Sequence, residues 1–164
     1  LTFRIGNTIK VSFSSLPFLV LAFLYGPVEG LVAGLIGSFL SQLLTFGITQ
    51  TTIFWIIPFA LEALVAGLVY IVLERQAKIF PIAVSVFAGG LVAVIFNLIG
   101  SYFDGVVFFK YLTVEVLIAL IPIRLAKWAV ISVIYIIILV PVTKALQKSF
   151  PAGYRSTKKK IEIA

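Results

Sequence analysis

An acidic residue stands inside one of the most apolar stretches of this chain, on the same helical face as two aromatic residues. Trp55, Phe59 and Glu62 follow one another at spacings of four and three residues, which places them on one side of an α-helix. Glu62 lies eleven residues beyond Thr51, about 16 Å at the helical rise. Two interpretations stay open: a carboxylate that recognises a ligand, and a protonated Glu62 that hydrogen-bonds a neighbouring helix.

Basic residues open the last apolar stretch of the chain. Arg124 and Lys127 follow Pro122, and Trp128 lies one turn beyond Arg124. Proline starts a helix well, but cations near a helix N-terminus oppose the helix dipole, so an anion or a carboxylate is expected nearby. Snorkelling to lipid headgroups is the alternative. It explains Arg124 well, whereas Lys127, one turn deeper, favours a ligand.

Other polar and aromatic residues extend this candidate site. Asn97 can both donate and accept hydrogen bonds, whereas Gln42 is expected to bond a neighbouring helix rather than a ligand. The predicted substrate-binding residues are Lys10, Trp55, Phe59, Glu62, Asn97, Tyr102, Tyr111, Arg124, Lys127 and Trp128.

Membrane-spanning helices must position these residues. Hydrophobic residues make up 62% of the chain and charged ones 12%, and about 20 apolar residues cross a bilayer as a helix. We predict an all-α membrane protein with one transmembrane domain over residues 1–147 and a basic cytoplasmic tail over 148–164. The expected spans are residues 11–25, 28–46, 52–73, 79–101 and 121–142.

The composition excludes several kinds of chemistry. The chain has no histidine, cysteine or methionine, which removes thiol catalysis, iron–sulfur clusters, haem ligation by these residues and histidine acid–base catalysis. No paired carboxylates suit a magnesium ion. We therefore expect no enzyme activity, no catalytic residue, no metal and no cofactor in this chain. The net charge of +7 follows the positive-inside rule of membrane proteins and does not indicate nucleic acid.

The basic tail sets the expected orientation. With the C-terminus in the cytoplasm, the connection at 74–78 also lies inside, and residues 1–10, 47–51 and 102–120 lie outside. An odd number of spans then leaves Leu1 outside. We expect one further helix to precede residue 1; five true spans with a processed N-terminus is the alternative.

Two sequence features allow more than one interpretation. Gly30, Ala33, Gly34 and Gly37 form small-xxx-small patterns, which indicate either a tightly packed bundle or a face that docks a partner subunit. The connection over residues 102–120 is long and rich in aromatic residues. We expect it to form a lid over the outer mouth, with an ordinary interfacial aromatic belt as the alternative.

Several motifs together resemble the substrate-binding S component of energy-coupling factor (ECF) vitamin transporters. In chain order they are Ile9-Lys10-Val11-Ser12-Phe13-Ser14-Ser15-Leu16-Pro17, Tyr25-Gly26-Pro27-x-x-Gly30, Ser38-x-x-Ser41-Gln42-Leu43-Leu44, Ala60-Leu61-x-Ala63-Leu64-x-x-Gly67-Leu68 and Ile121-Pro122-x-Arg124-Leu125-x-Lys127. Each motif is weak alone, but their order and spacing cover nearly the whole chain.

The resemblance implies a six-helix S-component bundle, of which the first helix is absent here. It also implies capture of a water-soluble vitamin outside the cell and association with a transmembrane T component and two ATPase subunits, which would hold ATP and magnesium. The family places its pocket where residues 4–15, 55–62, 97–111 and 124–128 fall here.

The choice of vitamin rests on the charges of this site. The basic residues favour an acid, with pantothenate first and folate close behind, whereas Glu62 beside Trp55 would suit hydroxymethylpyrimidine. Two other classes of protein stay open: a self-sufficient small channel or carrier, and a membrane scaffold without a ligand.

Overall fold

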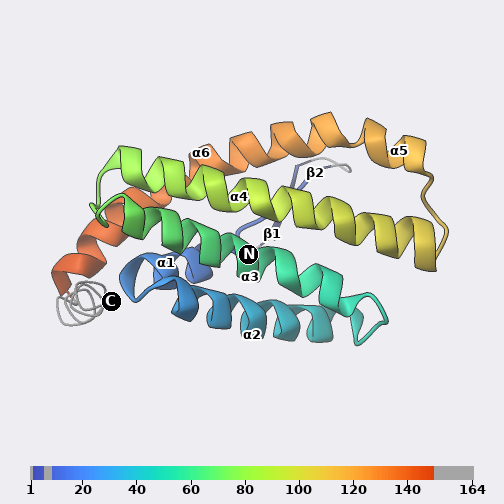
Figure 1. Cartoon of the computed structure of the whole chain (residues 1–164), viewed down its shortest axis with the longest axis horizontal. Coiled ribbons are helices and arrows are strands. Elements are labelled where there is room, and N and C mark those ends of the chain that lie inside the picture. Colours follow the sequence, from blue (N-terminus) through green and yellow to red (C-terminus); the bar gives the residue numbers. More distant parts are fainter. Residues whose placement is uncertain (1, 6–8, 150–164) are drawn as a thin grey trace.

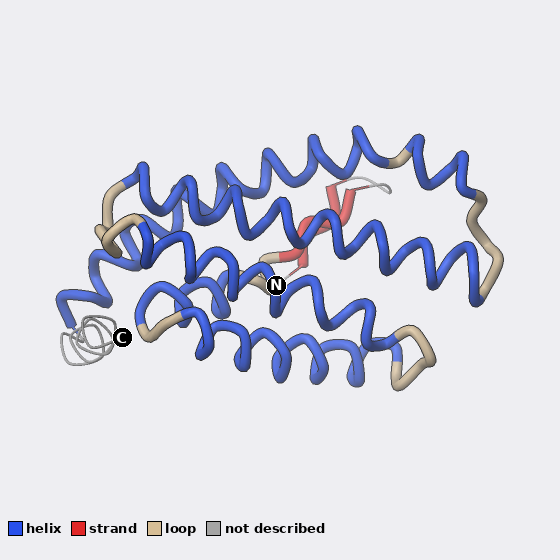
Figure 2. Tube along the Cα trace, viewed as in Figure 1, coloured by secondary structure: helices blue, strands red, loops and turns tan. Residues whose placement is uncertain are grey.

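The chain folds into helices preceded by a short β-hairpin. The computed structural model describes residues 2–5 and 9–149, and within the two strands it describes the backbone only. The elements are β1 (Thr2–Ile5), β2 (Ile9–Ser12), α1 (Leu16–Leu24), α2 (Pro27–Phe46), α3 (Thr52–Val72), α4 (Ile79–Ser101), the π-helix η1 (Tyr102–Phe108), α5 (Val114–Ala119) and α6 (Ile121–Ser149). The strands are antiparallel, with Arg4 opposite Lys10 (Figure 2).

Four long helices lie side by side in the order α2, α3, α4, α6 (Figure 1). The short helix α1 packs against α2, α3 and α6. One end of the layer carries the turn at 47–51 and η1, and we call it the Gly47 end. The opposite end carries the turn at 73–78 and the end of α6, and we call it the Arg75 end.

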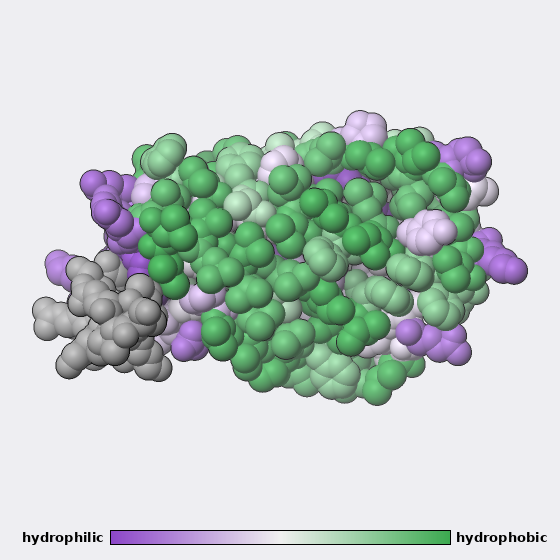
Figure 3. All heavy atoms as spheres, in the orientation of Figure 1, coloured by the Kyte–Doolittle hydropathy of each residue, from purple (hydrophilic) through white to green (hydrophobic). Residues whose placement is uncertain are grey.

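The face of the molecule seen in Figure 3 is mostly apolar. Four helical segments are long and apolar enough to cross a membrane: Pro27–Phe46, Thr52–Val72, Ile79–Phe108 and Val114–Ser149. Less than half of each apolar window is buried inside the chain, so large aliphatic and aromatic side chains face outward. Lipid is the solvent that suits such a surface. The predicted all-α membrane class is confirmed, with the N-terminal hairpin as an unpredicted addition.

The first predicted span differs most from the structure. The sequence predicts it over residues 11–25, but α1 covers only the nine residues Leu16–Leu24, about 14 Å of helix. Val11 and Ser12 belong to β2 instead. Pro17, in the first turn of α1, has no N–H to donate and its ring would clash with the carbonyl of a helical residue four positions earlier, which favours a helix start at this point. A membrane-length apolar run is therefore split between a strand and a half-length helix.

At the other end of the chain, α6 is longer than predicted. It continues to Ser149, seven residues beyond the expected end of the span at residue 142. Lys148 is therefore still helical, and the predicted boundary between residues 147 and 148 falls inside the helix. The rest of the predicted basic tail, residues 150–164, lies outside the described residues.

The small residues of α2 pack inside the chain. A side chain at Gly30 would come within 2.5 Å of Ala22 in α1, and one at Gly34 within 2.8 Å of the Ala60 backbone in α3. A side chain at Gly37 would come within 2.5 Å of the Phe18 ring in α1. Ala33 is half-buried. For Gly30, Gly34 and Gly37 the tightly packed bundle is therefore observed. Docking of a partner subunit on this helix stays a prediction.

A solid hydrophobic core fills the Arg75 half of the bundle. The Phe23 and Tyr70 rings contact each other with centroids 4.5 Å apart, and Ile82 and Leu139 are fully buried beside them. The buried guanidinium of Arg75 donates to the carbonyl oxygens of Phe23 and Leu24 at 3.1 and 3.0 Å, which satisfies the C-terminus of α1. Because α1 begins only at Leu16, it does not extend into the Gly47 half of the bundle. Among the described residues, no hydrophobic core of similar size fills that half.

Candidate functional site

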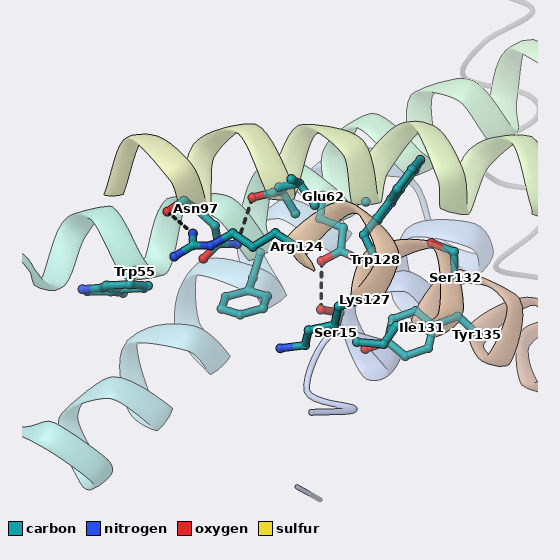
Figure 4. A pocket seen from close by; sticks show the side chains of 14 residues that line it. Ser15, Trp55, Glu62, Asn97, Arg124, Lys127, Trp128, Ile131, Ser132 and Tyr135 are labelled. Carbon is teal, nitrogen blue, oxygen red and sulfur yellow. Dashed lines mark hydrogen bonds between the residues drawn. The ribbon is translucent and has the colours of Figure 1, made fainter. Parts of the chain in front are cut away.

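A cavity of about 370 Å³ occupies the Gly47 half, between α3, α4, α6 and the turn before α1. Its size suits a small organic ligand. Figure 4 shows the 14 side chains that line it. They are Ser15, Trp55, Phe59, Glu62, Gly90, Ala93, Val94, Asn97, Arg124, Lys127, Trp128, Ile131, Ser132 and Tyr135.

Glu62 forms part of the cavity wall contributed by α3. It is 7% exposed, and its carboxyl oxygen Oε2 accepts a 2.8 Å hydrogen bond from the Ser15 hydroxyl, which faces it in Figure 4. Trp55 and Phe59 line the same cavity, so the helical spacing of the three residues places them together as predicted. The acid is thus buried in the protein interior, where hydrogen bonds are stronger than in water.

Arg124 links the start of α6 to α4. Its Nη1 donates to the Asn97 carbonyl oxygen at 3.1 Å, and its Nη2 donates to the Ser101 hydroxyl at 2.8 Å. Figure 4 shows the guanidinium reaching across to Asn97. These two hydrogen bonds hold the Arg124 guanidinium at the cavity. A side chain that only snorkels to headgroups, or one that waits free for a ligand, would need no such bonds to α4. A fixed guanidinium is a pre-organised partner for an anion.

Lys127 and Asn97 complete the polar wall near Arg124. Lys127 lies one turn beyond Arg124 on the exposed side of the cavity. The Asn97 side-chain nitrogen donates back to the Ala93 carbonyl at 2.8 Å, so its amide is oriented by its own helix. Two cations and one acid therefore line a cavity whose other walls are largely apolar.

Trp128 packs edge-on against Phe87 and directly over Gly90. The Trp128 and Phe87 ring centroids are 5.3 Å apart at an interplanar angle of 88°. A side chain at Gly90 would come within 2.5 Å of the indole nitrogen. Only a glycine at this position of α4 lets the indole lie against the helix, and this leaves the volume in front of it open.

A comparison with known protein families assigns the chain to one of them. The family model described as "ECF transporter, substrate-specific component" matches residues 2–139. The chain belongs to this family. Its members are transport subunits rather than enzymes, and the family implies a small substrate, a T component and ATPase partners. No curated protein and no solved structure matches the sequence significantly.

Two predicted site residues of this S component lie outside the cavity. Tyr102 is exposed in η1, and the Tyr111 hydroxyl donates to Asp104 Oδ2 at 2.6 Å. Asp104 also accepts from the Thr51 hydroxyl at 2.5 Å, so the carboxylate ties η1 to the turn before α3. The Asp104 carboxylate raises the pKa of Tyr111 from 10.0 to about 12, because it holds the phenolic proton.

The connection over residues 102–120 does not form the lid over the cavity that the sequence analysis expects. Most of it is helical, in η1 and α5, and although the structure describes all of its residues, none of them lines the cavity. The connection also contacts α3 through the stacked rings of Phe103 and Phe54, whose centroids are 4.8 Å apart. Lys10, the remaining predicted residue, lies in β2, and its side chain is outside the described part of the chain.

The S-component cavity also contains residues that the sequence analysis missed. Ile131, Ser132 and Tyr135 follow Trp128 at three, four and seven positions, so continuing the helical face of α6 would have found them. Ser15 closes the range 4–15 in which the family resemblance places its pocket, but helical spacing could not single it out, because it reaches Glu62 from the turn before α1. Gly90 has only its small size to mark it, among several small residues of α4.

Proposed function

We propose that this S component captures a small acidic vitamin or vitamin precursor in the cavity at the Gly47 end and delivers it across the membrane with its ECF partners. One observation carries the proposal: the cavity gathers Arg124, Lys127 and Glu62 in a wall that also holds aromatic side chains, inside a bundle whose outer surface is mostly apolar. Ionisable groups are costly within a membrane protein and are retained for function.

The distribution of basic residues supports an extracellular opening of the cavity. Lys144 and Lys148 lie near the end of α6, and Arg75 and Lys78 lie at the adjoining turn, all toward the Arg75 end. The sequence that follows α6 adds Arg155 and Lys158 to Lys160. The positive-inside rule therefore favours a cytoplasmic Arg75 end and C-terminus.

The charge balance favours an acid as the substrate. Arg124 and Lys127 outnumber Glu62, which is already bonded to Ser15. Pantothenate is our leading candidate, because its carboxylate suits the cations and its size suits a cavity of about 370 Å³. Folate carries two carboxylates, against one in pantothenate, on a much larger molecule. Hydroxymethylpyrimidine would instead place its amino group at Glu62 and its ring on Trp55.

Two observations count against the other classes of protein. A scaffold without a ligand is expected to fill its interior with side chains, yet the described residues leave this cavity open. A channel needs a path along the whole bundle, whereas Phe23, Tyr70, Ile82 and Leu139 close the Arg75 half.

Native mass spectrometry of the protein purified in detergent tests the proposal, because it reads a copurified ligand and the partner subunits together. We expect one vitamin-sized adduct, and calorimetric titration with pantothenate, folate and hydroxymethylpyrimidine should then give submicromolar binding of one of them. Absence of any adduct and of any submicromolar binder, with no ATPase module copurifying, would contradict the proposal.

A further inference from the structure

A second hollow of about 430 Å³ adjoins the cavity on the side of α2. The two share Trp55, Phe59, Asn97 and Lys127 as lining residues. We propose that the α2 side of this second hollow is a further subsite, which binds a hydroxyl- or amide-bearing arm of the ligand held in the first cavity. The inference rests on the proposed function and adds the shape of the substrate: an acid with a polar arm.

A polar stripe on α2 provides the chemistry. Ser38, Ser41, Gln42 and Thr45 are spaced by three, one and three residues, so they form one face of the helix, and all four line the second hollow. The outward faces of the same helix are apolar, with exposed Leu35, Ile36, Phe39, Leu40, Leu43 and Leu44. Hydroxyl and amide groups donate and accept hydrogen bonds but carry no charge. They suit a neutral polar arm rather than a second carboxylate.

Ser38 is the observation that points to a ligand. The residue is 7% exposed, it lines the hollow, and its hydroxyl has no hydrogen-bond partner among the described residues. Ser85 and Ser101 show the usual solution for a helical serine, since each bonds the carbonyl four residues earlier, at 2.7 and 2.8 Å. Ser38 differs from both. A buried hydroxyl without a partner is destabilising. Of the two such hydroxyls among the described residues, Ser38 and Thr143, Ser38 is the one that borders a described hollow, and because its oxygen is shielded in this structure, a ligand there would bond it after its side chain rotates.

The shared wall explains how one ligand can reach both sites. Lys127 borders both hollows, so an acid bound near it has one side toward Glu62 and the other toward α2. Trp55 and Phe59 offer ring surface to the part of the ligand between the two ends. Gln42, half-buried on the stripe, would then bind the arm and not a neighbouring helix.

Two variants and two matched controls test the subsite. Ser38→Ala and Gln42→Ala remove polar groups from the stripe. Thr143→Val is the control for Ser38, because Thr143 is also fully buried, its hydroxyl has no partner within the described part of the chain, and it lines neither hollow. Gln147→Ala is the control for Gln42, since Gln147 bonds Tyr70 at the Arg75 end. The probe is whichever of pantothenate, folate and hydroxymethylpyrimidine binds the wild-type protein most tightly in calorimetric titration.

We expect Ser38→Ala and Gln42→Ala each to weaken binding of the probe about threefold to tenfold, the usual effect of one hydrogen bond, with both controls within about twofold of wild type. Ser38→Ala and Thr143→Val should both keep or raise the melting temperature without ligand. Unchanged affinity in both stripe variants, while Lys127→Ala loses binding, would overturn the subsite and leave the proposed function standing. A lower ligand-free melting temperature in Ser38→Ala would also overturn it, because the hydroxyl would then serve the fold. If wild type binds none of the three probes, the proposed function fails and the subsite fails with it.

Discussion

The Ser15 hydroxyl donates a 2.8 Å hydrogen bond to the Glu62 carboxyl, 47 positions further along the chain. This contact joins the turn before α1 to the cavity wall formed by α3. It gives the deep acid a partner from the protein itself. The first two predictions follow from it.

Ser15→Ala should lower the free energy of unfolding by about 1–3 kcal/mol, because the buried Glu62 carboxyl loses the hydrogen bond from Ser15. Glu62→Gln keeps an oxygen that can accept from Ser15, so its loss should be smaller. Thermal unfolding in detergent measures both variants. Equal melting temperatures for wild type and Ser15→Ala would mean that the contact contributes nothing to stability.

Glu62→Gln also separates the candidate substrates. If the ligand is an acid held by Arg124 and Lys127, affinity for pantothenate should stay within about threefold of wild type, since the substitution removes a negative charge that the acid does not use. If the ligand is an aminopyrimidine, loss of the carboxylate should cost about tenfold or more. Titration of both compounds against the variant decides between them.

Lys127→Ala and Trp55→Ala should each weaken ligand binding about tenfold or more, because they remove a charged contact and a ring surface from the cavity. Lys148→Ala is the control for charge, since it removes a cation near the far end of α6. Calorimetric titration reads all three. Equal effects in the three variants would contradict the assignment of the cavity.

Gly90→Ala should weaken binding by roughly tenfold, because the new methyl group displaces the Trp128 indole into the cavity. A double-mutant cycle with Trp128→Ala supplies the control. In the Trp128→Ala background the effect of Gly90→Ala should largely disappear. Additive effects would show that Gly90 acts by another route.

Tyr111 predicts a pH dependence. Its folded pKa of about 12 lies above the ordinary value of 10.0 because Asp104 stabilises the neutral phenol. The contribution to stability is therefore fully present below pH 10 and is lost as the pH rises toward 12. The melting temperature of wild type should fall more steeply over this interval than that of Tyr111→Phe. Parallel curves would contradict the prediction.

Helical periodicity predicts part of the lining of this cavity. The spacing of Trp55, Phe59 and Glu62, and of Arg124 and Trp128, depends only on each helix being regular, and all five line the cavity. Helices of an apolar bundle turn their polar residues inward, so separate faces converge without any knowledge of their contacts.

The sequence-based predictions fail mainly where tertiary packing determines the local structure. Hydropathy cannot distinguish a strand from a helix in a short apolar run, which is why the sequence predicts a single span over residues 11–25. Tyr102 is a different case: it stands five residues beyond Asn97, about 140° around a regular helix, so helical periodicity alone turns it away from the face of α4 that lines the cavity. Ser15 depends on a turn whose path is set by packing.

The half-length of α1 has a consequence for how such a protein could diversify. The volume available to a substrate depends on where α1 begins, and α1 is not one of the four membrane-length segments found among the described residues. A change of a few residues before Leu16 would enlarge or shrink the hollow without altering a lipid-facing side chain of those segments. At this one wall of the cavity, the space for a substrate is thereby set by residues outside the membrane-length segments.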